Sequence, residues 1–233
     1  MSQQKKAVVM SSGGVDSTTC LALAVEALGR ENVVALSFEY GQKHVKELEC
    51  ADKIARHYGV RHIVLNLSQL LQYSDCPLLA KSGKEISHES YEEQIKKNGE
   101  GKVATYVPFR NGLMLSSAAA LAQSLFPDDE CGIWIGAHAD DAAGQAYADC
   151  SEAFTSAMSE AISIGTYRKV SVVAPLVNMN KAGVVAAGLK LNVPYELTWS
   201  CYEGGEKPCG TCATCIDRIE AFRANGVEDP IGY

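Results

Sequence analysis

The 233-residue sequence contains no apolar run that approaches the roughly 18 residues of a membrane span. Positive charge is also scarce, because 21 Lys and Arg residues stand against 28 Asp and Glu residues and leave a net charge of −7. This acidic mean field argues against a protein that binds nucleic acid by neutralising phosphates. The apolar stretch within MSQQKKAVVM is too short for a signal peptide. We therefore expect a cytoplasmic protein that binds neither membranes nor nucleic acid.

Internal repeats and low-complexity tracts are missing too, and a content of 47% hydrophobic and 21% charged residues indicates a globular protein. Short β-branched runs alternate with helical patterns, and this order predicts an α/β fold with a parallel, five-stranded, Rossmann-like sheet. The expected strands cover residues 7–10, 33–38, 61–67, 132–137 and 169–174, and the expected helices cover residues 17–28, 45–58, 110–125, 151–164 and 181–191. We expect this α/β domain to span residues 1–194.

The middle of the chain, residues 74–104, is less regular and carries few apolar anchors. Irregular segments of this length inside compact domains tend to be functional lids or mobile segments. Within it, residues 89–98 (ESYEEQIKKN) favour a short exposed helix. Further along, Asn180 precedes a helical pattern and is the expected N-cap of that helix.

Four of the nine cysteines fall within fifteen residues near the end of the chain, whereas Cys20 and Cys50 lie in helical segments and are expected in the core. In a reducing compartment such a cluster indicates a metal site and not disulfide bonds. Its C-x-x-C steps suit tetrahedral Zn²⁺, and four sulfurs leave no open position. We therefore expect structural zinc in a small C-terminal segment over residues 195–233, which ends in a final helix. Redox chemistry at two of these thiols is the alternative. The predicted ligands are Cys201, Cys209, Cys212 and Cys215.

The first turn from strand to helix, residues 12–17 (SGGVDS), has neither the lysine of a Walker loop nor the spacing of the dinucleotide fingerprint. The two glycines still allow backbone amides at the helix N-terminus to bind phosphate. Hydroxyl groups of Ser12, Ser17 and Thr18 can donate to a pyrophosphate, and Asp16 can hold Mg²⁺ or orient the loop. A plain tight turn with Asp16 as helix N-cap is the alternative.

Two further motifs follow predicted strands or precede a predicted helix. Residues 38–44 (FEYGQKH) lie at the carboxyl end of the second strand, where their aromatic rings can face a purine; the alternative is a simple strand end with His44 on the surface. Arg110 stands just before a helix, where its planar fork can bind phosphate or carboxylate, unless it forms a structural salt bridge.

The loop over residues 138–150 also follows a strand and should reach the same edge of the sheet. Its carboxylates, Asp141 and Asp149, can accept hydrogen bonds from the N–H edge of a guanine-like base. For Asp149, a capping arrangement with Glu152 is the alternative.

The motif Ser-Gly-Gly-x-Asp-Ser at the first strand-to-helix turn resembles the signature of the PP-loop ATP pyrophosphatase superfamily. The resemblance implies a sheet of the adenine nucleotide hydrolase type and cleavage of ATP between its α and β phosphates, which adenylates a substrate oxygen. It implies ATP contacts by Ser11, Ser12, Gly13, Gly14, Val15, Asp16, Ser17, Thr18, Thr19, Cys20, Leu21 and Phe38.

The motifs in order (SGGVDS, FEYGQKH, VPFRN, YADC and the cysteine cluster) resemble those of the 7-cyano-7-deazaguanine synthase family over residues 7–222. Two departures from the family pattern are Phe109, where many members have glycine, and Ala148, where many have proline. The resemblance implies catalytic roles for Asp16, Ser17 and Arg110. It implies substrate contacts by Tyr40, Gln42, His44, Arg110, Asn111, Asp141 and Asp149.

The family resemblance also implies an activity: an ATP-dependent ligase that converts 7-carboxy-7-deazaguanine and ammonia to the nitrile, in the biosynthesis of queuosine and related deazapurines. It implies ATP, Mg²⁺ and Zn²⁺ as cofactors, small-molecule substrates as partners, and a homodimer. One alternative is a PP-loop transferase that adds sulfur or a deazapurine to tRNA or protein. A non-catalytic zinc-knuckle module is another, but it leaves residues 12–17 unexplained.

Overall fold

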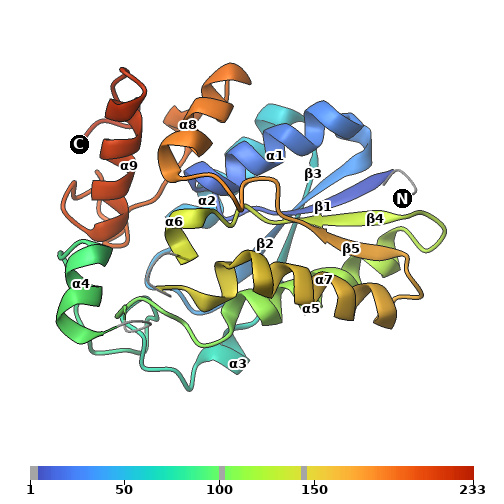
Figure 1. The fold of residues 1–233 in the computed structure, drawn as a ribbon, viewed down its shortest axis with the longest axis horizontal. Coiled ribbons are helices and arrows are strands. Elements are labelled where there is room, and N and C mark those ends of the chain that lie inside the picture. Colours follow the sequence, from blue (N-terminus) through green and yellow to red (C-terminus); the bar gives the residue numbers. More distant parts are fainter. Residues whose placement is uncertain (1–4, 100–102, 143–145) are drawn as a thin grey trace.

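A parallel sheet forms the centre of the structure, a computed structural model that describes residues 5–99, 103–142 and 146–233 (Figure 1). The five strands lie in the order β3-β2-β1-β4-β5, and all the pairs are parallel, as predicted. The strands are β1 (Lys6–Met10), β2 (Val33–Glu39), β3 (Arg61–Asn66), β4 (Cys131–Trp134) and β5 (Val170–Val173).

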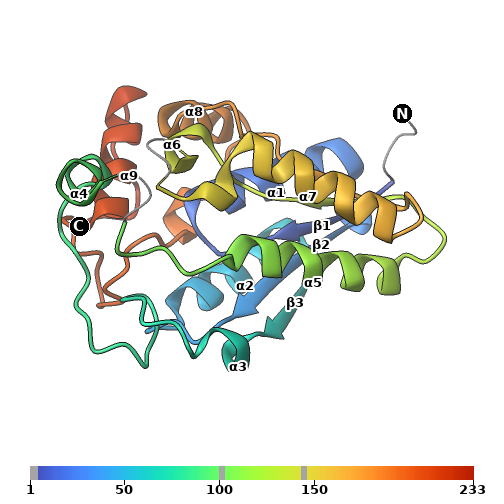
Figure 2. The ribbon, with the colours of Figure 1, turned by 60° about the horizontal axis from the view of Figure 1, so that its bottom comes forward.

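Helices cover both faces of this sheet (Figures 1 and 2). Side chains of β1 alternate between the two faces, so Val8 packs in one buried cluster with Leu115, whereas Val9 packs in the other with Leu21. One face is therefore covered by α5 and α7, and the other by α1, α2 and α8. The helices are α1 (Val15–Leu28), α2 (Lys46–Tyr58), α3 (Ser68–Leu71), α4 (Tyr91–Asn98), α5 (Arg110–Leu125), α6 (Ala139–Ala142), α7 (Glu152–Gly165), α8 (Lys181–Lys190) and α9 (Ala213–Ala224).

The predicted caps have different outcomes. The side chain of Asn180 accepts a hydrogen bond from the Gly183 amide and caps α8, as predicted. The alternative role of Asp149 as a cap of α7 is wrong, because Ser151 accepts the hydrogen bond from the helix amide there. Asp16 is not an N-cap either, since Gly14 occupies the N-cap position of α1 and Asp16 lies in its first turn.

The C-terminal segment packs on the helices of the α/β fold. Phe222 of α9 is 1% exposed and belongs to the same buried cluster as Leu21 of α1 and Val184 of α8. Figure 1 shows α9 beside α8, away from the sheet. The boundary between residues 194 and 195 stays a prediction. Within the described ranges, no helix has the length and apolar character needed to cross a membrane.

Candidate active site

A cavity of about 230 Å³ opens at the carboxyl ends of β1, β2 and β4. Parallel strands place their following loops at one edge of the sheet, so segments far apart in sequence meet there. The C-terminal segment forms another wall of this cavity. Lining residues include Ser12, Gly14, Asp16, Ser17, Phe38, Tyr40, Gln42, Glu47, Tyr91, Arg110, Asn111, Asp141, Tyr147, Lys181, Trp199, Tyr202 and Asp217.

The glycine loop after β1 is built by close backbone packing. Gly13 has a φ of 82°, and a Cβ atom there would lie 2.3 Å from the carbonyl oxygen of Glu47, so only glycine fits. Gly136, after β4, also lies close to this part of the chain, because an added Cβ would lie 2.8 Å from the carbonyl carbon of Asp16. The loop is thus held between α2 and the segment after β4, with Gly14 on the cavity wall.

The hydroxyl groups near this loop face two directions. Ser12 and Ser17 line the cavity, with their hydroxyl oxygens 3.0 Å apart. Thr18 donates to the Gly14 carbonyl at 2.7 Å, and Thr19 donates to the Val15 carbonyl at 2.9 Å. The hydroxyls of Thr18 and Thr19 therefore support α1 from inside.

Other residues implied for ATP binding also lie behind the cavity wall. Val15, Cys20 and Leu21 are at most 1% exposed and pack in the core. Phe38 and Ser11 are buried but line the cavity. The structure therefore brings Ser11, Ser12, Gly14, Asp16, Ser17 and Phe38 together around one cavity.

Asp16 lies in a cluster of charged groups at the cavity wall. Its Oδ2 accepts a hydrogen bond from Lys181 Nζ at 2.6 Å, and His138 Nε2 lies 3.7 Å from Oδ1 and 3.3 Å from the carboxylate of Asp141. Burial works to raise the pKa of Asp16, but Lys181 and His138 outweigh it and hold that pKa below its usual value. Burial raises the pKa of Asp141.

Lys181 is a site residue that the sequence motifs did not indicate. It is 165 residues from Asp16 in the chain, and it begins α8 directly after the Asn180 cap. A helix that follows a strand of a parallel sheet begins at the edge where ligands bind, so its first residue was a findable candidate. Lys181 also keeps its charge, because Asp16 and Asp141 outweigh the effect of burial and raise its pKa.

The predicted substrate residues divide into those that face the cavity and those that do not. Arg110 lies against the Tyr40 ring, 5.2 Å from its centroid, and donates to its hydroxyl at 3.2 Å. Gln42 Oε1 accepts from the Tyr40 amide at 2.8 Å and fixes the turn after β2. Asn111 and Asp141 line the same cavity.

His44 and Asp149 lie outside the set of residues that line the cavity. Asp149 is 4% exposed, and its carboxylate accepts from the Asn111 amide at 3.0 Å, at the beginning of α5. His44 packs against Gly204 instead. The Asp149 carboxylate therefore accepts from a free amide at the beginning of α5, and in this arrangement it does not face a ligand.

Three tyrosines to which the sequence analysis gave no site role join separate segments at the cavity. The Tyr91 hydroxyl lies 2.7 Å from that of Tyr202, and the Tyr147 hydroxyl donates to Tyr91 at 3.4 Å. Tyr91 begins α4, Tyr147 lies in the segment before α7, and Tyr202 directly follows Cys201. Tyr91 thus brings the segment of residues 74–104 to the cavity wall, and residues 100–102 of that segment lie outside the described residues. Its role as a lid stays a prediction.

The two departures from the family pattern have local explanations. Phe109 has a φ of 52°, in the left-handed region that favours glycine, and its side chain is 55% exposed beside the Phe154 ring. Ala148 begins a 3-10 turn (Ala148–Cys150) and is exposed. Neither side chain is among those that line the cavity.

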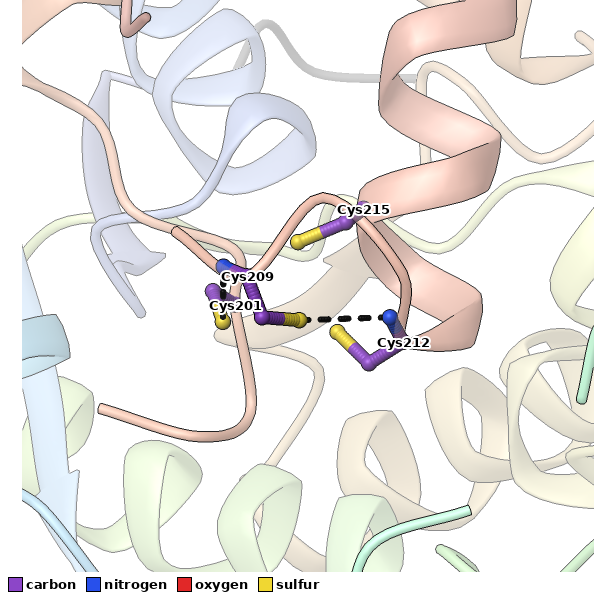
Figure 3. Close-up of side chains that lie close together, drawn as sticks. All are labelled: Cys201, Cys209, Cys212 and Cys215. Atoms are coloured by element: carbon purple, nitrogen blue, oxygen red, sulfur yellow. Dashed lines mark hydrogen bonds between the residues drawn. The ribbon is translucent and has the colours of Figure 1, made fainter. Parts of the chain in front are cut away.

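The four clustered thiols converge on one point (Figure 3). Their sulfur atoms all lie within 4.8 Å of one another, close to the separation of about 3.8 Å that a tetrahedron with 2.3 Å Zn–S bonds requires. The Cys209 amide donates to Cys201 Sγ, and the Cys212 amide donates to Cys209 Sγ, both at 3.3 Å. All nine cysteines of the chain are free. This donor set is compatible with a metal ion such as zinc.

A buried arginine ties this metal-site segment to the rest of the fold. Arg218 is 1% exposed, and its Nε and Nη2 donate to the two carboxylate oxygens of Asp229 at 2.7 and 2.8 Å. Its Nη1 donates to Thr198 at 2.8 Å, and its Nη2 to the Tyr195 carbonyl at 3.2 Å. The chain on both sides of the cysteines is therefore fixed.

The five-stranded parallel sheet and the glycine loop at its carboxyl edge define an α/β protein with the PP-loop fold. The same fold occurs in NMN synthetase from Francisella tularensis (TM-score 0.51, 15% identity, 97% of this chain and 79% of that chain). It also occurs in the U34-tRNA thiolase NcsA from Methanococcus maripaludis (TM-score 0.51, 16% identity, 96% of this chain and 68% of that chain).

Sequence comparison identifies the family. The profile of "Queuosine biosynthesis protein QueC" matches residues 6–226. The 7-cyano-7-deazaguanine synthase of Thermoplasma acidophilum is 42% identical, over 99% of this chain and 93% of the relative. That of Psychromonas ingrahamii is 38% identical, over 98% of both chains. The chain belongs to the QueC family of 7-cyano-7-deazaguanine synthases, as the sequence motifs predicted.

Proposed function

We propose that this protein is a ligase that uses ATP to convert 7-carboxy-7-deazaguanine and ammonia to 7-cyano-7-deazaguanine, in queuosine biosynthesis. One observation carries the proposal beyond family membership: the glycine loop and the guanidinium of Arg110 face the same cavity. The cavity therefore offers a phosphate-binding element and a carboxylate-binding element to one reaction centre.

The need for ATP follows from the substrate. A carboxylate is anionic and has no group that ammonia can displace. Attack of a carboxylate oxygen on the α-phosphorus of ATP releases pyrophosphate and leaves an acyl adenylate. Ammonia then displaces AMP and gives the amide.

The nitrile requires a second activation. The amide oxygen attacks a second ATP, pyrophosphate leaves, and loss of AMP with two protons from nitrogen forms the C≡N bond. The two rounds together consume two ATP and release two AMP and two pyrophosphate. Donors fixed around the developing phosphoryl charge supply the main acceleration in such transfers.

The chain's own residues suit these steps. Ser12, Ser17, Gly14 and Lys181 line one cavity, which supports the first three as phosphate contacts and Lys181 as the group that offsets phosphate charge. Asp16 Oδ1 is buried without a hydrogen-bond partner, which suits a ligand of Mg²⁺. When bound, that ion neutralises phosphate charge. Arg110 holds the substrate carboxylate toward the α-phosphorus.

We also propose structural zinc at the four thiols, a cytoplasmic location and a homodimer. Nine free cysteines support a reducing compartment. Zinc is supported by four thiols at nearly tetrahedral spacing and by amides that donate to two of them. The homodimer rests on family resemblance.

Incubation of the purified protein with ATP, ammonia and 7-carboxy-7-deazaguanine tests the activity, with the product followed by mass spectrometry. We expect the nitrile, with AMP and pyrophosphate as nucleotide products. Release of ADP would contradict the adenylate mechanism. Turnover that depends on added tRNA or protein would favour the transferase instead.

Replacement Asp16→Ala is expected to abolish nucleotide turnover and leave the fold intact, because it removes the proposed Mg²⁺ ligand. Turnover of ATP and the circular dichroism spectrum are the two measurements. Activity retained in a folded Asp16→Ala protein would remove the loop carboxylate from the mechanism.

A further inference from the structure

The proposed chemistry uses only Asp16 of the cavity carboxylates, and Glu47 differs from the rest because it has no partner among the described residues. Glu47 lies in the first turn of α2 and lines the cavity. Within the described residues, its carboxylate makes no hydrogen bond and no ion pair within 4.0 Å. Burial raises its pKa to about 7, against the opposing effect of the Arg110 charge. A carboxylate at this position lacks N–H donors, and burial of its charge without them is unfavourable.

The other acidic groups of the cavity already have partners or neighbours of opposite charge. Asp16 is bonded to Lys181, and Asp141 lies 3.3 Å from His138. Burial raises the pKa of Asp217 to about 6, and the positive charge of Lys181 opposes this rise. These three carboxylates all interact with the charge of Lys181.

Glu47 and Arg110 together form a pair of recognition groups that are not bonded to each other. Arg110 donates one of its five N–H groups to Tyr40, and the other four have no hydrogen bond to the described residues. The cavity thus presents one unused acceptor and several unused donors. A ligand that carries an anionic group and a pair of N–H donors matches both.

The 2-amino-4-oxopyrimidine ring of a deazaguanine has such a pair. Its N1–H and one N–H of the 2-amino group are parallel and adjacent, so one carboxylate can accept both. The 7-carboxylate lies on the other ring of the same molecule. Arg110 binding the acid and Glu47 binding the N–H edge would hold the base at both ends.

We propose that Glu47 selects the base, by accepting hydrogen bonds from the N1–H and 2-amino groups of the 7-deazaguanine substrate. The assignment rests on the proposed function and replaces Asp149, whose carboxylate is bound to the Asn111 amide. A site built to bind N–H groups rejects an analogue that lacks one, because its buried acceptor is left unpaired.

The test compares two substrates: 7-carboxy-7-deazaguanine and its analogue without the 2-amino group. The native protein is expected to prefer the first by about 10- to 100-fold in kcat/KM, the range for a hydrogen bond to a charged group. In Glu47→Gln that preference falls to within about 3-fold, because the neutral amide cannot accept from both N–H donors as the carboxylate does. The KM for ATP stays the same. Glu49→Gln, an exposed position on the same helix, keeps the native preference.

Glu47→Asp keeps the charge and serves as the second variant, with the preference retained at a lower rate. Preference unchanged in Glu47→Gln overturns the assignment, even while the native protein makes the nitrile. Loss of the preference in Glu49→Gln overturns it too, since the effect would then come from the helix and not from Glu47. If the native protein does not turn over 7-carboxy-7-deazaguanine, the proposed function fails and this assignment falls with it.

Discussion

Two arginines of this chain have opposite surroundings. All five N–H groups of Arg218 are used, in bonds to Asp229, Thr198, Ser200 and the Tyr195 carbonyl. Arg110 makes one hydrogen bond to the described residues, and that bond goes to Tyr40.

This difference distinguishes an arginine that stabilises the fold from one that can bind a ligand. A guanidinium whose donors are all used has nothing left to offer a ligand, so Arg218 holds the metal-site segment in place. A guanidinium beside a cavity with unused donors is prepared to bind. The hydroxyls differ in position and not in whether they are used. Those of Thr18 and Thr19 donate to the backbone inside α1, whereas Ser12 and Ser17 border the cavity, although Ser17 also donates to the Gly14 carbonyl at 3.2 Å.

The largest effect on stability is expected in the metal-site segment that Arg218 holds. Cys212→Ser removes one of the four thiols, and loss of a structural zinc forfeits on the order of 10 kcal/mol of binding free energy. We expect a protein without metal that melts earlier, measured by metal analysis and thermal unfolding. Cys50→Ser, outside the cluster, should keep about one zinc per chain. A Cys212→Ser protein that is equally metal-loaded would contradict a structural site.

Arg218→Met is expected to lower the free energy of unfolding by about 3–5 kcal/mol, because it leaves the Asp229 carboxylate buried without its partner. The side chain of Asp229 is 5% exposed. Urea unfolding measures the loss, and the double variant with Asp229→Asn should recover part of it. A change below about 1 kcal/mol would show that the saturated arginine is not a support.

Arg110→Met should lower activity and leave stability nearly unchanged, the opposite of what is expected for Arg218→Met. We expect kcat/KM for the acid substrate to fall about 100-fold, since a charge-assisted contact is lost, with the free energy of unfolding changed by less than about 1 kcal/mol. Steady-state kinetics and urea unfolding of one preparation give both numbers. Destabilisation as large as that of Arg218→Met would end the distinction between the two arginines.

The smallest effect is expected for Tyr195→Phe. The Tyr195 hydroxyl lies 2.8 Å from that of Thr19 in the core, and Thr19 keeps its bond to the Val15 carbonyl without it. The loss should be about 1 kcal/mol of unfolding free energy, with nucleotide turnover unchanged. A large loss of turnover would mean that the buried face of α1 affects the reaction.

Local patterns predicted much of the fold. Runs such as Ala7–Met10 and Val33–Phe38 became neighbouring strands, because β-branched residues in short runs pack well in a parallel sheet. The spacing of the cysteines predicted their convergence, since C-x-x-C steps bring sulfurs together locally.

The site was less predictable from the sequence. Residues 11–21 were assigned to ATP as one run, but they continue from a loop into a helix, where successive side chains point in different directions and only some meet the cavity. Lys181, Glu47 and the tyrosines reach the cavity through the packing of distant segments. Apart from Lys181, which its place at the beginning of α8 indicates, no local spacing encodes that convergence. Asp149 looked free in the sequence because its partner, the amide at the beginning of α5, is 38 residues away.

Tyr202 follows Cys201 directly in the chain and forms part of the cavity wall. The reaction chamber is therefore finished by a residue whose neighbour is a proposed zinc ligand. If the proposed zinc leaves the thiols, the peptide bond between Cys201 and Tyr202 carries that loss to the cavity wall. Zinc content and turnover of a preparation should therefore fall together.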